Sequence, residues 1–108
     1  MNVINFLLVK NMHIMIKDYT QNDAATSYTK GKECFELMVT ALDKGEDVTL
    51  DFKDVNFVLM AFLNPIIGDT IFKYGSDIMQ KIKINFANES ILSKIKIVKD
   101  GAMTKIIK

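Results

Sequence analysis

Two aspartates and a histidine are the residues of this 108-residue chain whose side chains could do acid–base chemistry. Asp51 and Asp54 lie close together at the end of a predicted strand, and paired carboxylates can act as general acid and base. His13 is the single histidine. With no nucleophile or metal-ligand set beside them, turn capping explains the aspartates better, and a strand position explains His13 better. An enzyme would need a pocket where all three side chains converge.

The single cysteine, Cys34, excludes an intramolecular disulfide and a zinc site built from several cysteines. It flanks the apolar stripe of a predicted helix, which favours an inert thiol over a nucleophile. We therefore expect no catalytic residue, no metal site and no cofactor. A lone cysteine is also consistent with a reducing, cytoplasmic setting.

The charge balance gives the chain no global attraction to nucleic acid or to anionic membranes. Its net charge is +1, with 49% hydrophobic and 25% charged residues, as in ordinary globular domains. The C-terminal third is locally basic, although it contains no arginine. Its lysines are Lys81, Lys83, Lys94, Lys96, Lys99, Lys105 and Lys108. A solvated face is the simpler interpretation, and a nucleic-acid-associated module that uses these lysines is the alternative.

The N-terminal segment is apolar at residues 3–9 but has neither a basic start nor a cleavage site, so we expect no signal peptide. It is also shorter than the roughly 20 apolar residues that span a bilayer. We predict a strand at 3–9, a turn at 10–11 and a second strand at 12–17, forming a hairpin. Alternatively, residues 1–11 are an N-terminal extension. An exposed edge at 3–9 could pair in a homodimer.

The centre of the predicted fold is the stretch from residue 48 to residue 67. Apolar and polar residues alternate over 48–52, which predicts a strand, and Lys53 and Asp54 form a polar turn. Residues 56–59 extend again, and helical spacing then predicts a helix over 60–74. Pro65 is expected in or near its first turn, where a missing amide hydrogen costs little.

Two further helices and one strand complete the prediction. A polar loop at 18–29, with one helical turn at about 23–26, precedes a helix at 30–44 that ends at Gly45. The apolar stripe of that helix is expected to contain Phe35, Met38, Val39 and Leu42. A strand is predicted at 81–87. Asn88 then caps a helix that runs to about residue 99, with a strand at 94–98 as the alternative, and residues 102–108 form a last helical turn or a loose tail.

This order of elements predicts one α/β domain with a mixed sheet of about four strands and helices packed on it. The central stretch VTLDFKDVNFVLMAFLNPIIG resembles the signature of STAS-type domains, the group of the anti-sigma factor antagonists. LDFKDVNF, the Phe62-Leu63 pair and INFANES together are similar to a STAS-like bacterial family of uncharacterised function. The resemblance covers about residues 28–97. It implies a STAS-like single domain over residues 1–108 that is non-enzymatic and cytoplasmic.

The same resemblance implies where a partner would bind. In anti-sigma factor antagonists, the turn before the helix carries aspartate, serine, serine and glycine, and a switch kinase phosphorylates the second serine. Here those four positions hold Leu59, Met60, Ala61 and Phe62, so the serine switch is expected to be absent. The implied partner-binding residues are these four and Asn64. The implied partner class is a histidine-kinase-like ATPase or an anti-sigma-type regulator. Met60 either anchors in that partner or packs under the loop.

Overall fold

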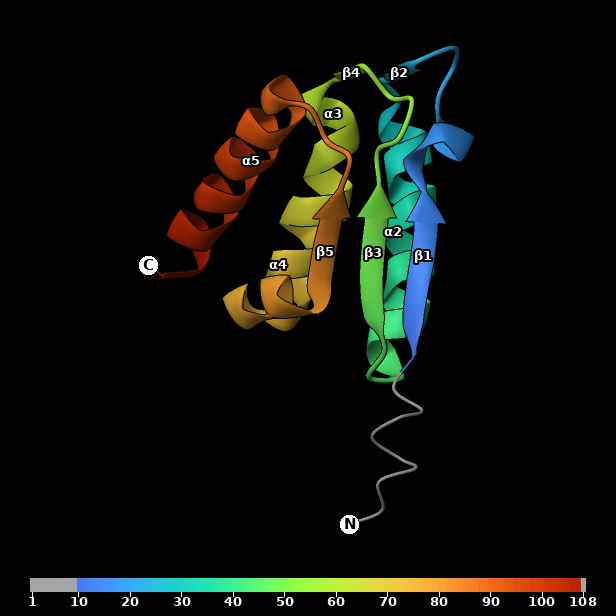
Figure 1. Cartoon of the computed structure of the whole chain (residues 1–108). Coiled ribbons are helices and arrows are strands. Elements are labelled where there is room, and N and C mark those ends of the chain that lie inside the picture. Colours follow the sequence, from blue (N-terminus) through green and yellow to red (C-terminus); the bar gives the residue numbers. More distant parts are fainter. Residues whose placement is uncertain (1–9, 108) are drawn as a thin grey trace.

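The computed structural model of the protein describes residues 10–107 (Figure 1). Strands β1 (Asn11–Met15), β3 (Asp47–Asp51) and β5 (Ile82–Asn85) form a three-stranded sheet in the order β1-β3-β5. Strands β2 (Ala24–Ala25) and β4 (Phe57–Val58) form a separate two-stranded sheet. The predicted α/β class is confirmed. The single mixed sheet of about four strands is wrong, because five strands form two sheets and all the strand pairs among the described residues are parallel.

The predicted N-terminal hairpin is only partly within the described residues, since its first strand at 3–9 and the proposed edge pairing lie outside them. Asn11, which was predicted to be in the turn, opens β1. β1 pairs in parallel with β3, and a 3-10 helix, η1 (Ile16–Tyr19), follows it where the strand was expected to continue. Ile14 of β1 and Ile16 of η1 are buried, whereas His13 of β1 is exposed.

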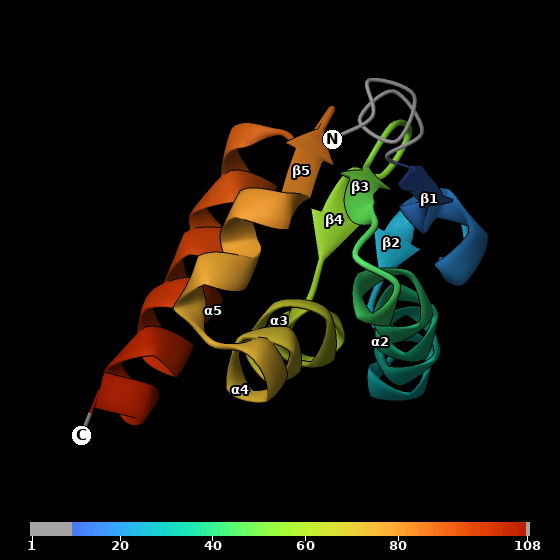
Figure 2. The same cartoon turned by 90° about the horizontal axis from the view of Figure 1, so that it is seen from below.

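The helices α2 (Tyr28–Asp43), α3 (Met60–Leu63) and α4 (Thr70–Tyr74) lie on one face of the three-stranded sheet (Figure 2). That face carries the buried Val48, Leu50 and Phe52 of β3 and its end. In the part of the chain that the structure describes, no helix lies over the opposite face of the sheet. On that face β3 carries the polar residues Thr49 and Asp51, which alternate with the buried apolar ones.

Helix α2 begins slightly earlier than predicted because the Ser27 side chain accepts a hydrogen bond from the Lys30 amide and caps it. Its buried face is Gly31, Cys34, Met38, Ala41 and Leu42. The predicted stripe was therefore rotated, since Phe35 and Val39 are only half-buried and Cys34 and Ala41 are core residues. The helical turn expected at 23–26 is wrong, because this segment contains β2.

The second helix runs from Met60 to Tyr74 as predicted, but it is not uniform. Between α3 and α4 lies a wider, π-helical stretch, η2 (Asn64–Asp69). Pro65 lies near the start of this stretch, just after the first turn, and it has no amide hydrogen to donate to the preceding turn. Gly75 ends the helix with a φ of 92°, a conformation that favours glycine, and the 3-10 helix η3 (Ser76–Lys81) leads into β5.

Helix α5 (Glu89–Ile107) is longer than predicted. The Asn88 side chain accepts a hydrogen bond from the Ile91 amide at 2.9 Å, which confirms the predicted cap. The break predicted after about residue 99 is not found, and the alternative strand at 94–98 is wrong. Residues 102–107 are helical, which agrees with the predicted last helical turn over 102–108 and not with the loose tail. The physical reason is burial: Ile95, Val98 and Ala102 are all less than a tenth exposed and continue one apolar stripe through the predicted break.

Gly101 gives a direct stability prediction. It lies in the interior of α5, and a Cβ atom added there would meet nothing within 4 Å. Glycine costs a helix interior about 0.5–1 kcal/mol relative to alanine. We expect Gly101→Ala to raise the free energy of unfolding by about that amount. Urea denaturation followed by circular dichroism measures it, and an unchanged or lowered midpoint would show that the helix is not formed at this position.

Candidate functional site

The residues predicted to bind a partner lie where β4 leads into the second helix. The Leu59 amide donates to the Ala25 carbonyl at 3.0 Å, and the Phe62 amide donates to the Leu59 carbonyl at 3.0 Å. These bonds fix the opening of the helix against β2. Leu59 is 41% exposed, Ala61 is also exposed and Met60 is half-buried.

Of the two remaining predicted residues, Phe62 is buried and Asn64 is exposed. Phe62 has no exposed surface and belongs to the hydrophobic core. It can support the surface from beneath, but its side chain cannot touch a docked partner. Asn64 is exposed one helical turn beyond Met60. Met60 packs against the core, as one of the two interpretations made from the sequence expects, and its side chain is partly accessible.

Helix α5 and its cap residue Asn88 hold the start of the second helix in place. The Lys94 ammonium of α5 donates to the Val58 carbonyl at 2.7 Å and lies 4.4 Å from the centre of the Phe57 ring. The Asn88 side chain donates to the Asn56 carbonyl at 3.1 Å. Phe57 is 45% exposed beside Leu59. We call Phe57, Leu59, Met60, Ala61 and Asn64 the helix-opening surface.

Sequence reasoning missed one exposed aromatic residue at the same end of the sheet. Phe86 follows β5, is 70% exposed and has a φ of 60°. Among the described residues, the other non-glycine positions with positive φ are Asn22 and Asp54, and all three lie in loops. Such conformations cost free energy and are enriched at functional sites. The phenylalanine of INFANES is Phe86, but the alternating pattern of residues 81–87 predicted that it lies within a strand.

A groove runs from the helix-opening surface between the second helix and α5. It has a volume of about 350 Å³ and begins at Met60. Asn64, Gly68 and Phe72 line one wall, and Ile97, Gly101 and Lys105 line the other. Sequence reasoning placed Met60 and Asn64 but missed the α5 wall, because the predicted helix ended too early. The exposed apolar Phe72 and Ile97, which lie off the buried stripes, were the signal that could have found it.

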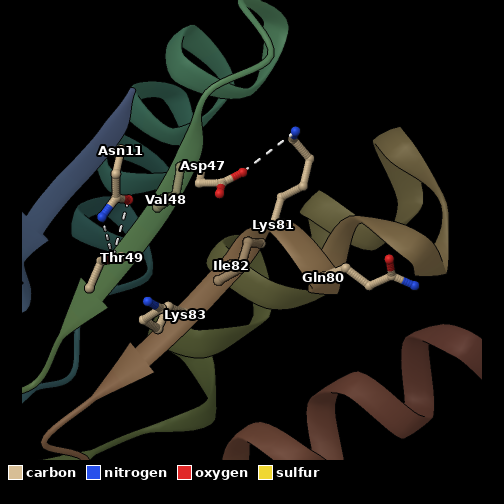
Figure 3. Close-up of a pocket in the computed structure, with 8 residues that line it drawn as sticks. All are labelled: Asn11, Asp47, Val48, Thr49, Gln80, Lys81, Ile82 and Lys83. Carbon is tan, nitrogen blue, oxygen red and sulfur yellow. Dashed lines mark hydrogen bonds and ion pairs between the residues drawn. The ribbon is translucent and has the colours of Figure 1, made fainter. Parts of the chain in front are cut away.

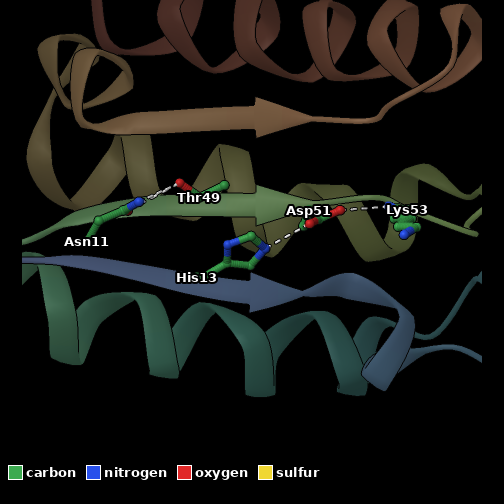
Figure 4. Close-up of polar contacts among 5 residues, drawn as sticks. All are labelled: Asn11, His13, Thr49, Asp51 and Lys53. Carbon is green, nitrogen blue, oxygen red and sulfur yellow. Dashed lines mark hydrogen bonds and ion pairs between the residues drawn. The ribbon is translucent and has the colours of Figure 1, made fainter.

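His13 and Asp51 meet on the sheet face that no described helix covers (Figure 4). The His13 Nε2 and Asp51 Oδ2 atoms are 2.7 Å apart, although the two residues are far apart in sequence. The Asp51 side chain is 6% exposed and the His13 side chain is 50% exposed. Among residues 10–107, no hydrogen bond joins the Asp54 carboxylate to this pair. The convergence of all three side chains that an enzyme would need is therefore not found in the described structure.

More than half of the chain matches the model of a known family. Residues 30–92, from the first turn of α2 to the first turn of α5, match the model of the family described as "STAS-like domain of unknown function (DUF4325)". The chain belongs to this STAS-like family. The match confirms the resemblance drawn from LDFKDVNF and INFANES, and it includes all of the helix-opening surface and one wall of the groove. Searches of curated proteins and of solved structures returned no match.

The STAS-like domain also has a polar hollow of about 320 Å³ near the amino ends of β3 and β5 (Figure 3). Asn11 Nδ2 donates to Thr49 Oγ1 at 2.9 Å on one side, and Lys81 lies 3.5 Å from Asp47 on the other. The predicted partner-binding residues do not line this hollow, which opens at the end of the sheet opposite the helix-opening surface.

The remaining features that the sequence raised are the single cysteine, a metal site and a membrane-spanning segment. Cys34 is completely buried, and burial raises the pKa of its thiol to about 12, which disfavours the nucleophilic thiolate. Among residues 10–107, no group of three His, Cys, Asp or Glu side chains could hold a metal ion. Within the same residues, none of the helices combines the length and hydrophobicity that crossing a bilayer requires.

Asp51 makes the stability of the STAS-like domain depend on pH. The Lys53 amide donates to its carboxylate at 2.8 Å, and this bond, with the smaller contribution of His13, lowers the pKa of Asp51 against the opposing effect of burial. In an unfolded chain the pKa is about 3.9. Since the folded pKa is lower, ionised Asp51 stabilises the fold above about pH 4, and this contribution is lost as the pH falls through the folded pKa.

We therefore expect Asp51→Asn to lower the free energy of unfolding most at neutral pH, with a difference from wild type that shrinks below about pH 4. Denaturant titrations at a series of pH values measure this. Asp54→Asn, which removes the same charge from an exposed side chain, controls for the change in net charge. If the difference in the free energy of unfolding between Asp51→Asn and wild type stayed constant down to pH 3, the pKa of Asp51 would not be the cause of the pH dependence.

Proposed function

We propose that this STAS-like domain is a non-enzymatic protein-interaction module that docks a regulatory partner on the helix-opening surface. The observation that carries the proposal is the apolar character of that surface: Phe57 and Leu59 are 45% and 41% exposed side by side at the start of the second helix. Exposed apolar side chains gathered on a rigid scaffold are typical of protein-binding sites.

The partner class comes from the family resemblance. It is a histidine-kinase-like ATPase or an anti-sigma-type regulator in a bacterial cytoplasm. Ala61 occupies the position of the phosphorylated serine in anti-sigma factor antagonists, and its methyl group cannot accept a phosphoryl group. Release of this partner would therefore depend on something other than phosphorylation at that position.

The direct test is an affinity pull-down from host lysate with tagged wild type, Met60→Asp and Leu59→Asp, read by mass spectrometry. The proposal expects an ATPase-type regulator with wild type and its loss with both variants, because a buried carboxylate without a partner is costly in an apolar interface. Leu92→Asp is the matched control, since Leu92 is 47% exposed on α5 outside this surface and groove. Equal recovery of the regulator by all four baits would count against the surface.

The alternative, nucleic-acid association through the basic C-terminal third, has a separate test. The structure engages some of these lysines within the domain: Lys81 with Asp47, Lys96 with Asp100, and Lys94 with the Val58 carbonyl. Binding through phosphate contacts would retard DNA or RNA in a gel with a steep dependence on salt. Absence of a shift at low salt would remove this alternative.

A further inference from the structure

We propose that the groove between the second helix and α5, the α5 groove, binds an acidic amphipathic helix of a partner protein. This inference rests on the proposed function, because it describes where a partner that contacts Met60 would continue. The wall from the second helix is Asn64, Gly68 and Phe72, and the wall from α5 is Ile97, Gly101 and Lys105.

The shape of the groove fits a helix. The α5 wall is a row of residues spaced four apart, the ridge along which α-helices pack against one another. The wall from the second helix has the same sequence spacing but begins in the π-helical stretch η2. Each row has a glycine at its centre. A Cβ atom added at Gly101 would meet nothing within 4 Å, and one added at Gly68 would meet only Val98, at 3.7 Å. The groove is therefore open at the exposed Gly101, where the backbone of a third helix can approach α5 closely, whereas Gly68 on the opposite wall is buried.

The groove has apolar side chains to bind the apolar face of such a helix. Phe72 is 48% exposed and Ile97 is 57% exposed, on opposite walls. The α5 wall spans about 12 Å at the α-helical rise of 1.5 Å per residue, which matches apolar anchors at positions i, i+3 or i+4, and i+7 of a bound helix.

The charges around the groove indicate an acidic partner. α5 carries four lysines, Lys94, Lys96, Lys99 and Lys105, against only Glu89 and Asp100. Lys94 and Lys96 are engaged with the Val58 carbonyl and with Asp100, whereas Lys105 lines the groove itself. The acidic group in the groove lining, Asp69, lies 3.5 Å from Lys32, and Asp100 lies 2.8 Å from Lys96, so both carboxylates are already compensated. A second copy of this chain would bring one lysine-rich helix against another, which like-charge repulsion disfavours. Acidic groups that flank an apolar face complement the groove instead.

The test is a selection from a display library of 16-residue peptides, randomised at every position, with the full-length protein as target. Counter-selection uses Ile97→Lys, which places a charge on the apolar wall. Enriched peptides with a negative net charge and apolar residues at helical spacing support the proposal. Enrichment of neutral or basic peptides, or no enrichment over the counter-selection, overturns it.

One enriched peptide, synthesised with a fluorescent label, then locates the site. We expect Gly101→Leu, which fills the centre of the groove without breaking the helix, to weaken binding by tenfold or more in fluorescence anisotropy. Lys105→Glu is expected to weaken it several-fold, with Lys83→Glu on β5 as the matched charge control. Leu92→Lys on α5 is the control for Ile97→Lys. Equal effects of the groove variants and their controls overturn the proposal, as does concentration-dependent dimerisation that Ile97→Lys abolishes.

The same variants separate this inference from the proposed function. In the pull-down, a regulator lost with Leu59→Asp but retained by Ile97→Lys and Gly101→Leu would leave the helix-opening surface intact and overturn the α5 groove. Loss with the groove variants and with Leu59→Asp supports a partner that spans both surfaces. Peptides selected by the groove while no regulator is recovered would support the groove and overturn the proposed partner class.

Discussion

Phe62→Ala is expected to lower the free energy of unfolding by about 3–5 kcal/mol, the usual cost of truncating a fully buried phenylalanine. The Phe62 side chain has no exposed surface and lies in the core at the first turn of the second helix. Alanine removes its dispersion contacts and leaves a cavity that the neighbouring helices can only partly fill. Guanidinium chloride denaturation followed by circular dichroism measures the loss.

Phe86→Ala is the matched control for this prediction. It removes the same side chain from a position that is 70% exposed, so the change should stay within about 0.5 kcal/mol. Similar losses in the two variants would show that Phe62 is not a core residue. The comparison matters for function as well, because loss of a partner with Phe62→Ala would reflect unfolding rather than a removed contact.

The elements that the sequence predicted well are those with strong local signals. Apolar residues alternate over β3, Asn88 caps α5, and glycine ends both α2 and the second helix in left-handed conformations, at Gly45 and Gly75. Each signal comes from neighbouring residues, so it can be interpreted without knowing the tertiary contacts. The rotation of α2 was misjudged because Phe35 and Cys34 are both apolar, and only the packing decides which one is buried.

The features that the sequence did not reveal depend on contacts between distant segments. Alternation in a strand does not specify its neighbour or their relative direction, so the parallel β1-β3-β5 order could not be predicted. The His13–Asp51 hydrogen bond follows from that register and not from any local motif. Asp100 and Gly101 are weak helix formers, but burial of Ala102 on the far side of them overrides their propensity.

In the candidate site, too, the sequence predicted where the site lies but not which of its residues are exposed. The resemblance to the family located the start of the second helix, and Leu59 and Ala61 are exposed there. Which of the site residues face solvent was set by the helix phase, which buries Phe62. The groove beyond Met60 depends on α5 packing beside η2, a contact between segments that are distant in sequence.

Gly31→Ala is expected to destabilise the domain by about 1–3 kcal/mol, even though alanine is the better helix former. An added Cβ atom at Gly31 would lie 2.5 Å from the Phe62 carbonyl oxygen and 2.7 Å from Cγ of Pro65. A main-chain carbonyl and a proline ring cannot rotate away as a flexible side chain would. Helix α2 would have to move away from the second helix and would loosen the core between them.

Gly101→Ala is the control for Gly31→Ala, because it makes the same chemical change in a helix interior where the added methyl group meets open space. Denaturant titrations of the two variants should shift in opposite directions. If Gly31→Ala also raised the free energy of unfolding, the close approach of α2 to Phe62 would be wrong. That contact positions the opening of the second helix, so a destabilised Gly31→Ala protein should also bind more weakly to any partner that docks on the helix-opening surface.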